Sequence, residues 1–352
     1  MHHPLSASPP EISADKGPDR CGIAIRDAFN VRARALAQRE DASSQLAYAL
    51  AVPVDETVDF ERMDPVALQR MLEQRTADGQ RALMRAVELA PDKPDILFMA
   101  ATQCRGGDAC RGVQKALLAA APDNMAAWLL EMSWAKMRND PEASERAFER
   151  AAKATRYDTY AESALKALVE AYGGMPMPVE CSSDAAKAAL RRATGMDHDF
   201  RMLDQALLMG NASRVLPAYN DIRVRCMPQP GKTMGAATRE GCRNILTRMA
   251  DGDTLIERAI AVSTMVQLAA DDPDASAWRE RYRGDRWMLA QLGNSDIQRI
   301  LQPEDYWIDE ARSLQAALEV LGRWPPPADW LPEDERSRSL IQTGRPPPPK
   351  QR

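Results

Sequence analysis

The sequence predicts an all-α protein built of stacked antiparallel helical hairpins, and three observations favour this fold class. Aromatic residues make up only 5% of the 352 residues, while 45% are hydrophobic and methionine is plentiful, which suits closely packed helices better than sheets. Two Ala-Pro-Asp corners, at 90–92 and 121–123, interrupt alanine-rich sequence. Between such breaks apolar residues recur at steps of three and four, the period of one buried helix face.

The first part of the chain is expected to hold a disordered lead-in over 1–20, where prolines and glycines occur without an apolar period. A helical array is expected over 21–175. Asp41 is expected to cap its second helix, and Asp64 with Pro65 to start a third whose buried stripe holds apolar side chains. These are Val66, Leu68, Met71 and Leu72.

The centre of the array is expected to contain six further helices. Gly79 is expected to open one that Pro91 ends, because proline cannot continue the hydrogen-bond ladder. Asp108 and Asp140 are expected to cap two others. The helix over 124–137 is apolar nearly all round, which predicts that it is sandwiched between neighbours. The expected ranges are 80–90, 97–102, 108–121, 124–137, 141–152 and 159–172.

This central stretch, clearest over 79–156, resembles the tetratricopeptide repeat family in a divergent form. Aromatic, small and proline residues stand at the family's spacings. The family's Leu-Gly pair and helix-A tyrosine are absent, however, and the 31-residue corner spacing is shorter than the usual repeat. The resemblance implies a curved array with a concave face that binds a protein or peptide segment. The expected repeat core is Leu83, Ala86, Pro91, Leu97, Pro122, Trp128, Phe148 and Ala151.

Beyond a Gly-Gly-Met-Pro-Met-Pro linker at 173–178 the repeat punctuation stops, and a C-terminal helical region is expected over 176–322. The expected helices there are 200–209, 213–226, 236–250, one capped by Asp253, one from Asp274, and 305–322. Residues 323–352 hold eight prolines. They are therefore expected to be an extended polyproline II or disordered tail.

Six cysteines would permit three disulfides. Cys104 and Cys110 flank a helix corner at a separation that allows pairing, and Cys226 and Cys242 lie on consecutive helices around a loop. Both pairs are possible disulfides, with free thiols or a redox pair as alternatives. Cys21 and Cys181 could pair only if the array brings them together. No second ligand pair or histidine cluster completes a zinc tetrahedron.

Two observations conflict about the compartment. No apolar run approaches the length needed to span a bilayer, and the first 20 residues lack the apolar core of a secretion signal. These features favour a cytoplasmic location without a transmembrane segment. The even cysteine number instead favours an oxidising compartment such as the periplasm.

The candidate catalytic residues are few, and the sequence predicts no enzyme, cofactor or metal. His198 lies between two aspartates without a nucleophile motif, so a solvated or capping role is favoured. Arginines at 279–286 surround aromatic residues, but nearby acidic residues and a net charge of −5 argue against a nucleic-acid binder.

The favoured function is therefore a non-catalytic interaction or scaffold protein that binds a protein or peptide partner. Two alternatives stay open. One is a thiol/disulfide redox protein that uses Cys104 and Cys110, and the other is a toxin-neutralising binding protein of the cell envelope.

Overall fold

The computed structural model describes residues 20–52, 64–104, 107–173, 175–188, 219–229, 231–292, 294–301 and 309–348. Within these ranges it contains fifteen α-helices and a short 3-10 helix, η1, and no named strand. The predicted all-α class is therefore confirmed. The expected helix over 200–209, the first six residues of that over 213–226 and His198 lie outside the described residues. Residues 219–226 are described and form a helix, as expected.

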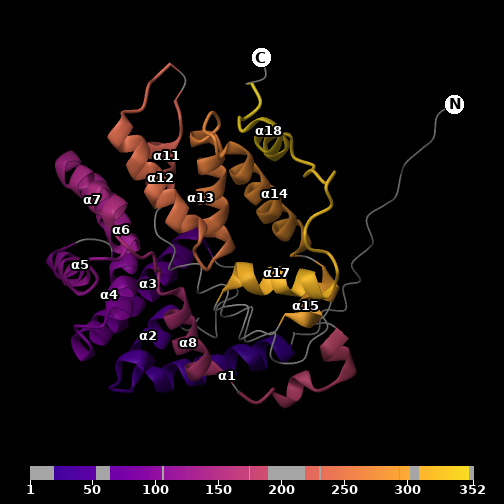
Figure 1. Ribbon diagram of the computed structural model, residues 1–352. Coiled ribbons are helices and arrows are strands. Elements are labelled where there is room, and N and C mark those ends of the chain that lie inside the picture. The colour runs from indigo at the N-terminus through magenta and orange to yellow at the C-terminus, as the bar shows by residue number, and fades with distance from the viewer. Residues whose placement is uncertain are drawn as a thin grey trace.

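From α3 to α7 the helices follow one another with connections of three or four residues. Figure 1 shows the N-terminal half in indigo and magenta beside the orange and yellow C-terminal helices. The N-terminal elements are α1 (Arg20–Ala37), α2 (Ala42–Leu50), α3 (Pro65–Leu89), α4 (Pro94–Gln103), α5 (Asp108–Ala120), α6 (Met125–Met137), α7 (Pro141–Lys153), α8 (Ala161–Tyr172) and η1 (Val179–Cys181). The C-terminal elements are α11 (Tyr219–Cys226), α12 (Ala236–Ala250), α13 (Leu255–Leu268), α14 (Ala275–Gln291), α15 (Ser295–Ile300), α17 (Glu310–Val320) and α18 (Glu335–Thr343).

Aspartate caps begin several helices where the sequence predicts them. The carboxylate of Asp41 accepts from the backbone N–H of Ser44 at 2.8 Å, and that of Asp140 from Ala143 at 2.9 Å. Asp64 accepts from the N–H of Val66 at 2.8 Å, directly before Pro65. Each cap satisfies a backbone donor that the helix itself cannot pair. Asp108 is instead the first residue of α5, and Gly107, with a φ of 91°, is the cap.

Helix α3 corrects two predictions. It runs without interruption through Gly79, so the two helices expected around that residue are one. A Cβ at Gly79 would lie 3.2 Å from the carbonyl oxygen of Ala49, so glycine lets α3 approach α2 closely. The buried stripe expected in its first half is also wrong, because Val66 is 60% exposed and Leu72 is 47% exposed.

Neighbouring helices along the chain pack against each other in most of the molecule: α2 with α3, α3 with α4, α4 with α5, α6 with α7, α12 with α13 and α13 with α14. Helix α8 departs from this order and packs against α1, α2 and α4. The ring of Tyr172 stacks on Phe29 with centroids 4.4 Å apart, and Arg32 Nε donates to the carbonyl oxygen of Ala171 at 2.6 Å. In a simple repeat array each unit contacts only its neighbours. The return of α8 therefore closes the N-terminal helices into a packed group.

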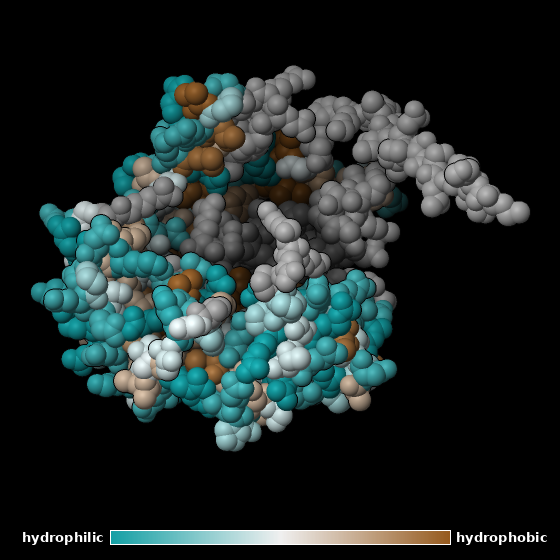
Figure 2. Space-filling view, turned by 90° about the horizontal axis from the view of Figure 1, so that it is seen from above, coloured by the Kyte–Doolittle hydropathy of each residue, from teal (hydrophilic) through white to brown (hydrophobic). Residues whose placement is uncertain are grey.

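Two hydrophobic cores meet at α6. Leu130 and Trp134 face the core formed with α1–α5 and α8, while Leu129 and Met132 face the core formed with α7 and α11–α14. The predicted sandwiching of this helix is thus confirmed. A third, smaller core joins α14, α15 and α17. Hydrophilic residues cover most of the coloured surface on the face shown in Figure 2, where hydrophobic residues form small separate groups.

The expectation of an extended or disordered tail over 323–352 is wrong in part, because α18 forms within it. Leu340 of α18 is 1% exposed and belongs to the core of α12–α14. The hydroxyl groups of Ser337 and Tyr282 lie 3.0 Å apart in a buried hydrogen bond. An apolar anchor and a buried polar contact thus hold α18 against α13 and α14.

Three disulfides crosslink the chain. Both pairs expected from the sequence form, Cys104 with Cys110 and Cys226 with Cys242. The fold also brings Cys21 of α1 to Cys181 of η1, with Cα atoms 4.7 Å apart across 160 residues. All six cysteines are buried. None of the described helices carries an apolar stretch long enough to cross a bilayer.

Candidate functional site

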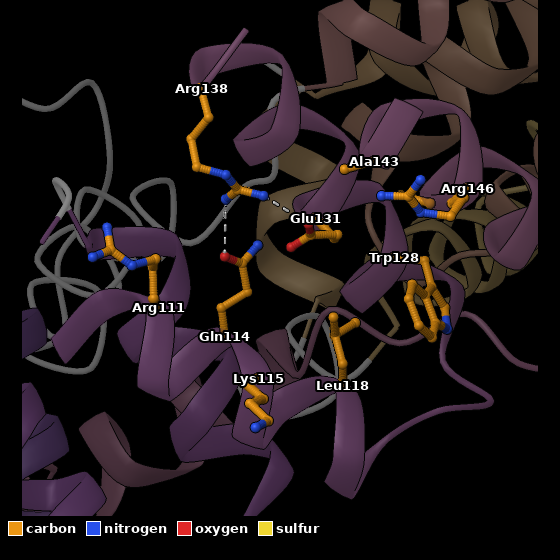
Figure 3. A pocket seen from close by; sticks show the side chains of 10 residues that line it. Arg111, Gln114, Lys115, Leu118, Trp128, Glu131, Arg138, Ala143 and Arg146 are labelled. Atoms are coloured by element: carbon orange, nitrogen blue, oxygen red, sulfur yellow. Dashed lines mark hydrogen bonds and ion pairs between the residues drawn. The ribbon is translucent and has the colours of Figure 1, made fainter. Parts of the chain in front are cut away.

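A groove of about 400 Å³ lies where α5 meets α6 and α7. Figure 3 shows its cationic side chains around an opening with Gln114 and Glu131 near the centre. Ligand pockets have volumes of about 300–1,000 Å³, so this groove lies at the lower end of that range. The groove is lined by Arg111, Gln114, Lys115, Leu118, Trp128, Glu131, Arg138, Ala143, Arg146 and Ala147.

Helical spacing places these side chains on three facing surfaces. On α5 the lining residues Arg111, Gln114, Lys115 and Leu118 are three or four positions apart and so share one face. The same spacing joins residues 128 and 131 on α6, and 143 and 147 on α7. The Asp140 cap fixes the start of α7. The groove is therefore formed by one face of each of three consecutive helices.

A polar centre organises the groove. Arg138 donates through one nitrogen to Glu131 Oε1 at 2.9 Å and through another to Gln114 Oε1 at 3.5 Å. Gln114 is only 5% exposed, and its Nε2 has no hydrogen-bond partner within the described residues. A buried donor without a partner costs free energy of folding, so it marks a position that an acceptor would satisfy.

Cations form the rim of the groove. Lys115 is exposed and makes no ion pair with any described residue. Arg111 pairs with Asp108 one turn before it on α5, and Arg146 lies 3.6 Å from Glu142 on α7. Both pairs are largely exposed, and exposed pairs within a helix contribute little to stability. The rim therefore carries cationic side chains whose ion pairs within the protein are weak.

An apolar end completes the groove beside Leu118. Trp128 is half-buried, and its indole Nε1 donates to the carbonyl oxygen of Pro122 at 2.8 Å. The guanidinium of Arg150 lies 6.0 Å from the centre of the indole ring. These contacts hold Trp128 in place, so the apolar surface is preorganised.

The residues expected to form the repeat core divide into three groups. Most are buried, namely Leu83, Ala86, Leu97, Phe148 and Ala151, whereas Pro91 and Pro122 are exposed at their corners. Trp128 lines the groove. Sequence reasoning did not single out Gln114 or Arg138, although the polar spacing of three and four on α5 could have indicated a shared face.

A second polar cluster lies at the junction of the two halves of the molecule. Glu257 of α13 is 1% exposed, and its Oε1 accepts from Tyr219 at 2.6 Å and from Thr159 at 3.0 Å. Tyr157 extends the chain of hydroxyls by donating to Tyr219 at 3.3 Å. Burial raises the pKa of Glu257 above its usual value, and the donated hydrogen bonds oppose this rise. The cluster is enclosed and joins α13, α11 and the segment before α8.

Three of the four arginines considered as a nucleic-acid patch form ion pairs within the fold. Arg281 pairs with Asp251 at 2.8 Å, Arg283 with Glu280 at 2.7 Å, and Arg286 with Asp334 at 3.0 Å. The last pair ties α14 to the residue that caps α18. These contacts assign the three arginines a structural role.

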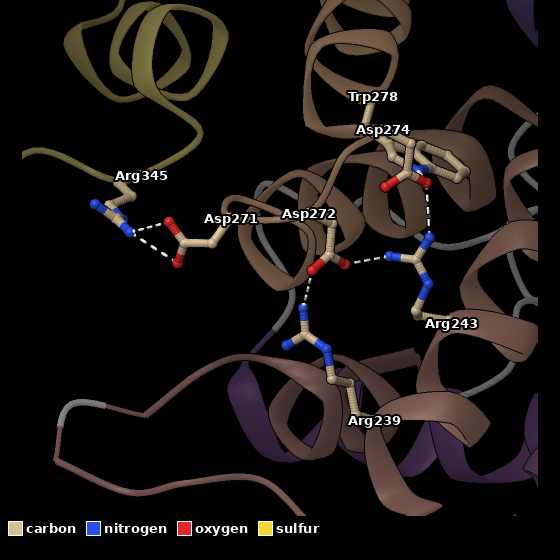
Figure 4. A network of polar contacts seen from close by, with 7 residues as sticks. All are labelled: Arg239, Arg243, Asp271, Asp272, Asp274, Trp278 and Arg345. Carbon is tan, nitrogen blue, oxygen red and sulfur yellow. Dashed lines mark hydrogen bonds and ion pairs between the residues drawn. The ribbon is translucent and has the colours of Figure 1, made fainter. Parts of the chain in front are cut away.

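A second arginine network fastens α12 to the turn between α13 and α14. Asp272 accepts from Arg239 at 2.7 Å and from Arg243 at 2.5 Å, and Arg243 also donates to Asp274 at 2.6 Å (Figure 4). In the same region Arg345, after α18, donates to Asp271. These ion pairs thus hold the C-terminal helices together.

Comparison of this chain with protein-family models, with curated proteins and with solved structures finds no match. Among the described residues no group of three or more His, Cys, Asp or Glu side chains could hold a metal ion.

Proposed function

We propose that this chain is a non-catalytic scaffold whose helical hairpins, similar to tetratricopeptide repeats, hold a segment of a partner protein. The observation that carries the proposal is the groove of α5, α6 and α7, with its preorganised Trp128 and its unpaired Gln114 amide. A hollow that combines apolar surface with a few convergent polar groups is the usual form of a binding site.

The resemblance implies binding on a concave face, but the proposal assigns it to this groove. Helix α8 packs against α2 and α4, and all residues of α4 from Ile96 to Ala101 are buried. These helices offer little free surface for a partner. The groove on α5–α7 has space for a ligand, and its lining includes the Gln114 amide nitrogen, which lacks a hydrogen-bond partner in the described residues.

The redox alternative receives less support from the surroundings of its cysteines. Cys110 is 1% exposed and Cys104 is 9% exposed, so an attacking thiolate would have little access to either sulfur. A structural crosslink between α4 and α5 fits this burial better. In the proposed scaffold, the disulfide only fixes α5 against the end of α4.

The test is a steric block that leaves the charge of the groove unchanged. Ala143→Tyr places a ring inside the groove, and Ala120→Tyr places the same ring on the exposed side of α5 opposite the groove face as the matched control. The wild-type chain and both variants are used to capture proteins from an extract of the source cells. Each captured protein is then purified and its binding remeasured by calorimetry.

Binding that survives Ala120→Tyr and falls at least about tenfold in Ala143→Tyr would support the proposal, since lost complementarity at a small pocket has effects of this size. Unfolding curves of both variants must match the wild type. If no purified protein binds the wild-type chain, or if Ala143→Tyr binds as tightly as Ala120→Tyr, the proposal is overturned.

A further inference from the structure

We infer that the occupant of the α5–α7 groove is an acidic segment of a partner protein that places one apolar side chain between Leu118 and Trp128. This inference rests on the proposed function and adds the chemistry of the partner. Its basis is the arrangement of charge, hydrogen-bond donors and apolar surface around the groove in Figure 3.

The charge around the groove favours an anionic ligand. Four cationic side chains line it, and its single carboxylate, Glu131, is already bound to Arg138. The side chain of Lys115 has no ionic partner among the described residues, and the partners of Arg111 and Arg146 are 91% and 86% exposed. A carboxylate entering the groove would therefore gain attraction without breaking a buried pair.

The hydrogen-bond donors favour the same ligand. Arg138 donates a hydrogen bond to the amide oxygen of Gln114, so the amide nitrogen of Gln114 is left to bind another group. That nitrogen is buried and has no acceptor in the described part of the chain. A carboxylate or a peptide carbonyl oxygen of the occupant would supply the acceptor, and bonds from buried donors to anions are strong.

The apolar end distinguishes a protein segment from a simple anion or a nucleic acid. Leu118, Trp128 and Ala147 form an apolar corner beside the cations, which suits an aliphatic or aromatic side chain next to acidic ones. Stacking of a nucleobase on Trp128 would compete with Arg150, whose guanidinium lies over the ring. An amphipathic acidic segment fits both parts of the groove at once.

The experiment measures binding of three fluorescent probes to the full chain by anisotropy at low and physiological salt. The first is an acidic peptide of about twelve residues, Glu and Asp around a single Leu, and the second has the same sequence with Gln and Asn instead. The third is a thymidine oligonucleotide of similar length. The acidic peptide is expected to bind at least about tenfold more tightly than the other two probes, and more weakly as salt increases.

Two double variants of equal charge locate the site. Lys115→Glu with Arg146→Glu reverses charge in the groove, and Lys166→Glu with Arg338→Glu does so on exposed positions of α8 and α18. The groove variant is expected to weaken binding of the acidic peptide by about tenfold or more, while the control variant retains wild-type affinity.

Several outcomes would overturn the inference. These are equal affinity for the acidic and neutral peptides, preferred binding of the oligonucleotide, and equal losses in the two double variants. Self-association that the groove variant abolishes would assign the groove to a second copy of this chain and also contradict the inference. If a purified partner loses affinity with Ala143→Tyr but is not displaced by the acidic peptide, only the inference fails and the proposed function stands.

Discussion

At the scale of single residues, Glu257 is a buried carboxyl group to which no cationic side chain in the described part of the chain donates a hydrogen bond. Hydroxyl groups of Tyr219 and Thr159 donate to one of its oxygens, and burial raises its pKa. The folded state therefore holds its proton to higher pH than the unfolded state does. The stability that Glu257 contributes is present below its ordinary pKa of 4.5 and is lost as pH rises through the higher pKa of the folded state.

Glu257→Gln is expected to remove this pH dependence. The amide oxygen can still accept both hydroxyl hydrogen bonds, and the variant has no charge to bury. Because burial raises the pKa of Glu257, the wild type loses stability relative to the variant as pH rises, so the variant should gain stability relative to wild type between pH 4 and pH 8. Urea unfolding at both pH values measures this gain.

Glu149→Gln, at an exposed position of α7, makes the same substitution outside the buried cluster and serves as the control. A difference between Glu257→Gln and wild type that stays constant with pH would show that the carboxyl group of Glu257 has the same pKa in the folded and unfolded states.

At the scale of elements, glycines within helices show which contacts between helices are close. A Cβ at Gly241 in α12 would lie 2.9 Å from ring atoms of Phe148 in α7, so glycine permits these helices to approach. A Cβ at Gly112 in α5 would meet no heavy atom within 4 Å. Both residues lie inside helices, and only their surroundings differ.

Alanine substitution at these two glycines is expected to have opposite effects. Gly112→Ala should raise the free energy of unfolding by about 0.5–1 kcal/mol, because alanine has less conformational freedom to lose. Gly241→Ala should lower it by about 1–3 kcal/mol, because the ring of Phe148 or the helix must shift. Denaturant unfolding of each variant measures the difference. Stabilisation by Gly241→Ala would show that α7 and α12 are not closely packed there.

At the scale of the whole molecule, the three disulfides close rings of very different size. They join residues 6, 16 and 160 positions apart. The Cys21–Cys181 bond links the first helix to the segment after α8, and so reinforces the packing of α8 against α1 and α2. In the chain-entropy description the larger ring restricts the unfolded chain more.

Removal of each disulfide by paired Cys→Ser substitution should therefore destabilise the protein in order of ring size. The expected losses are about 2 kcal/mol for Cys104–Cys110, about 3 kcal/mol for Cys226–Cys242 and about 5 kcal/mol for Cys21–Cys181. Chemical unfolding of the oxidised proteins tests the order. A loss for Cys104–Cys110 equal to that for Cys21–Cys181 would contradict it, and six reactive thiols in the unfolded, unreduced wild-type chain would contradict all three bonds.

The sequence by itself determined the features that depend on near neighbours in the chain. Asp41, Asp64 and Asp140 cap helices because a side chain and the next backbone N–H groups suffice for a cap. The two apolar faces of α6 follow from the period of its apolar residues. Cys104 and Cys110 are close in the chain, so the short corner between them keeps their side chains near each other.

The tertiary structure alone decided the features that join distant segments. An apolar face shows that a helix is buried, but it does not show which helices cover that face. The contact of α8 with α1, α2 and α4 therefore could not be inferred from the spacing of its apolar residues. The same holds for the Cys21–Cys181 bond and for the meeting of Gln114 with Arg138 in the groove. Local hydrogen bonds and periods are encoded within a few residues, whereas the choice of packing partners is a property of the whole chain.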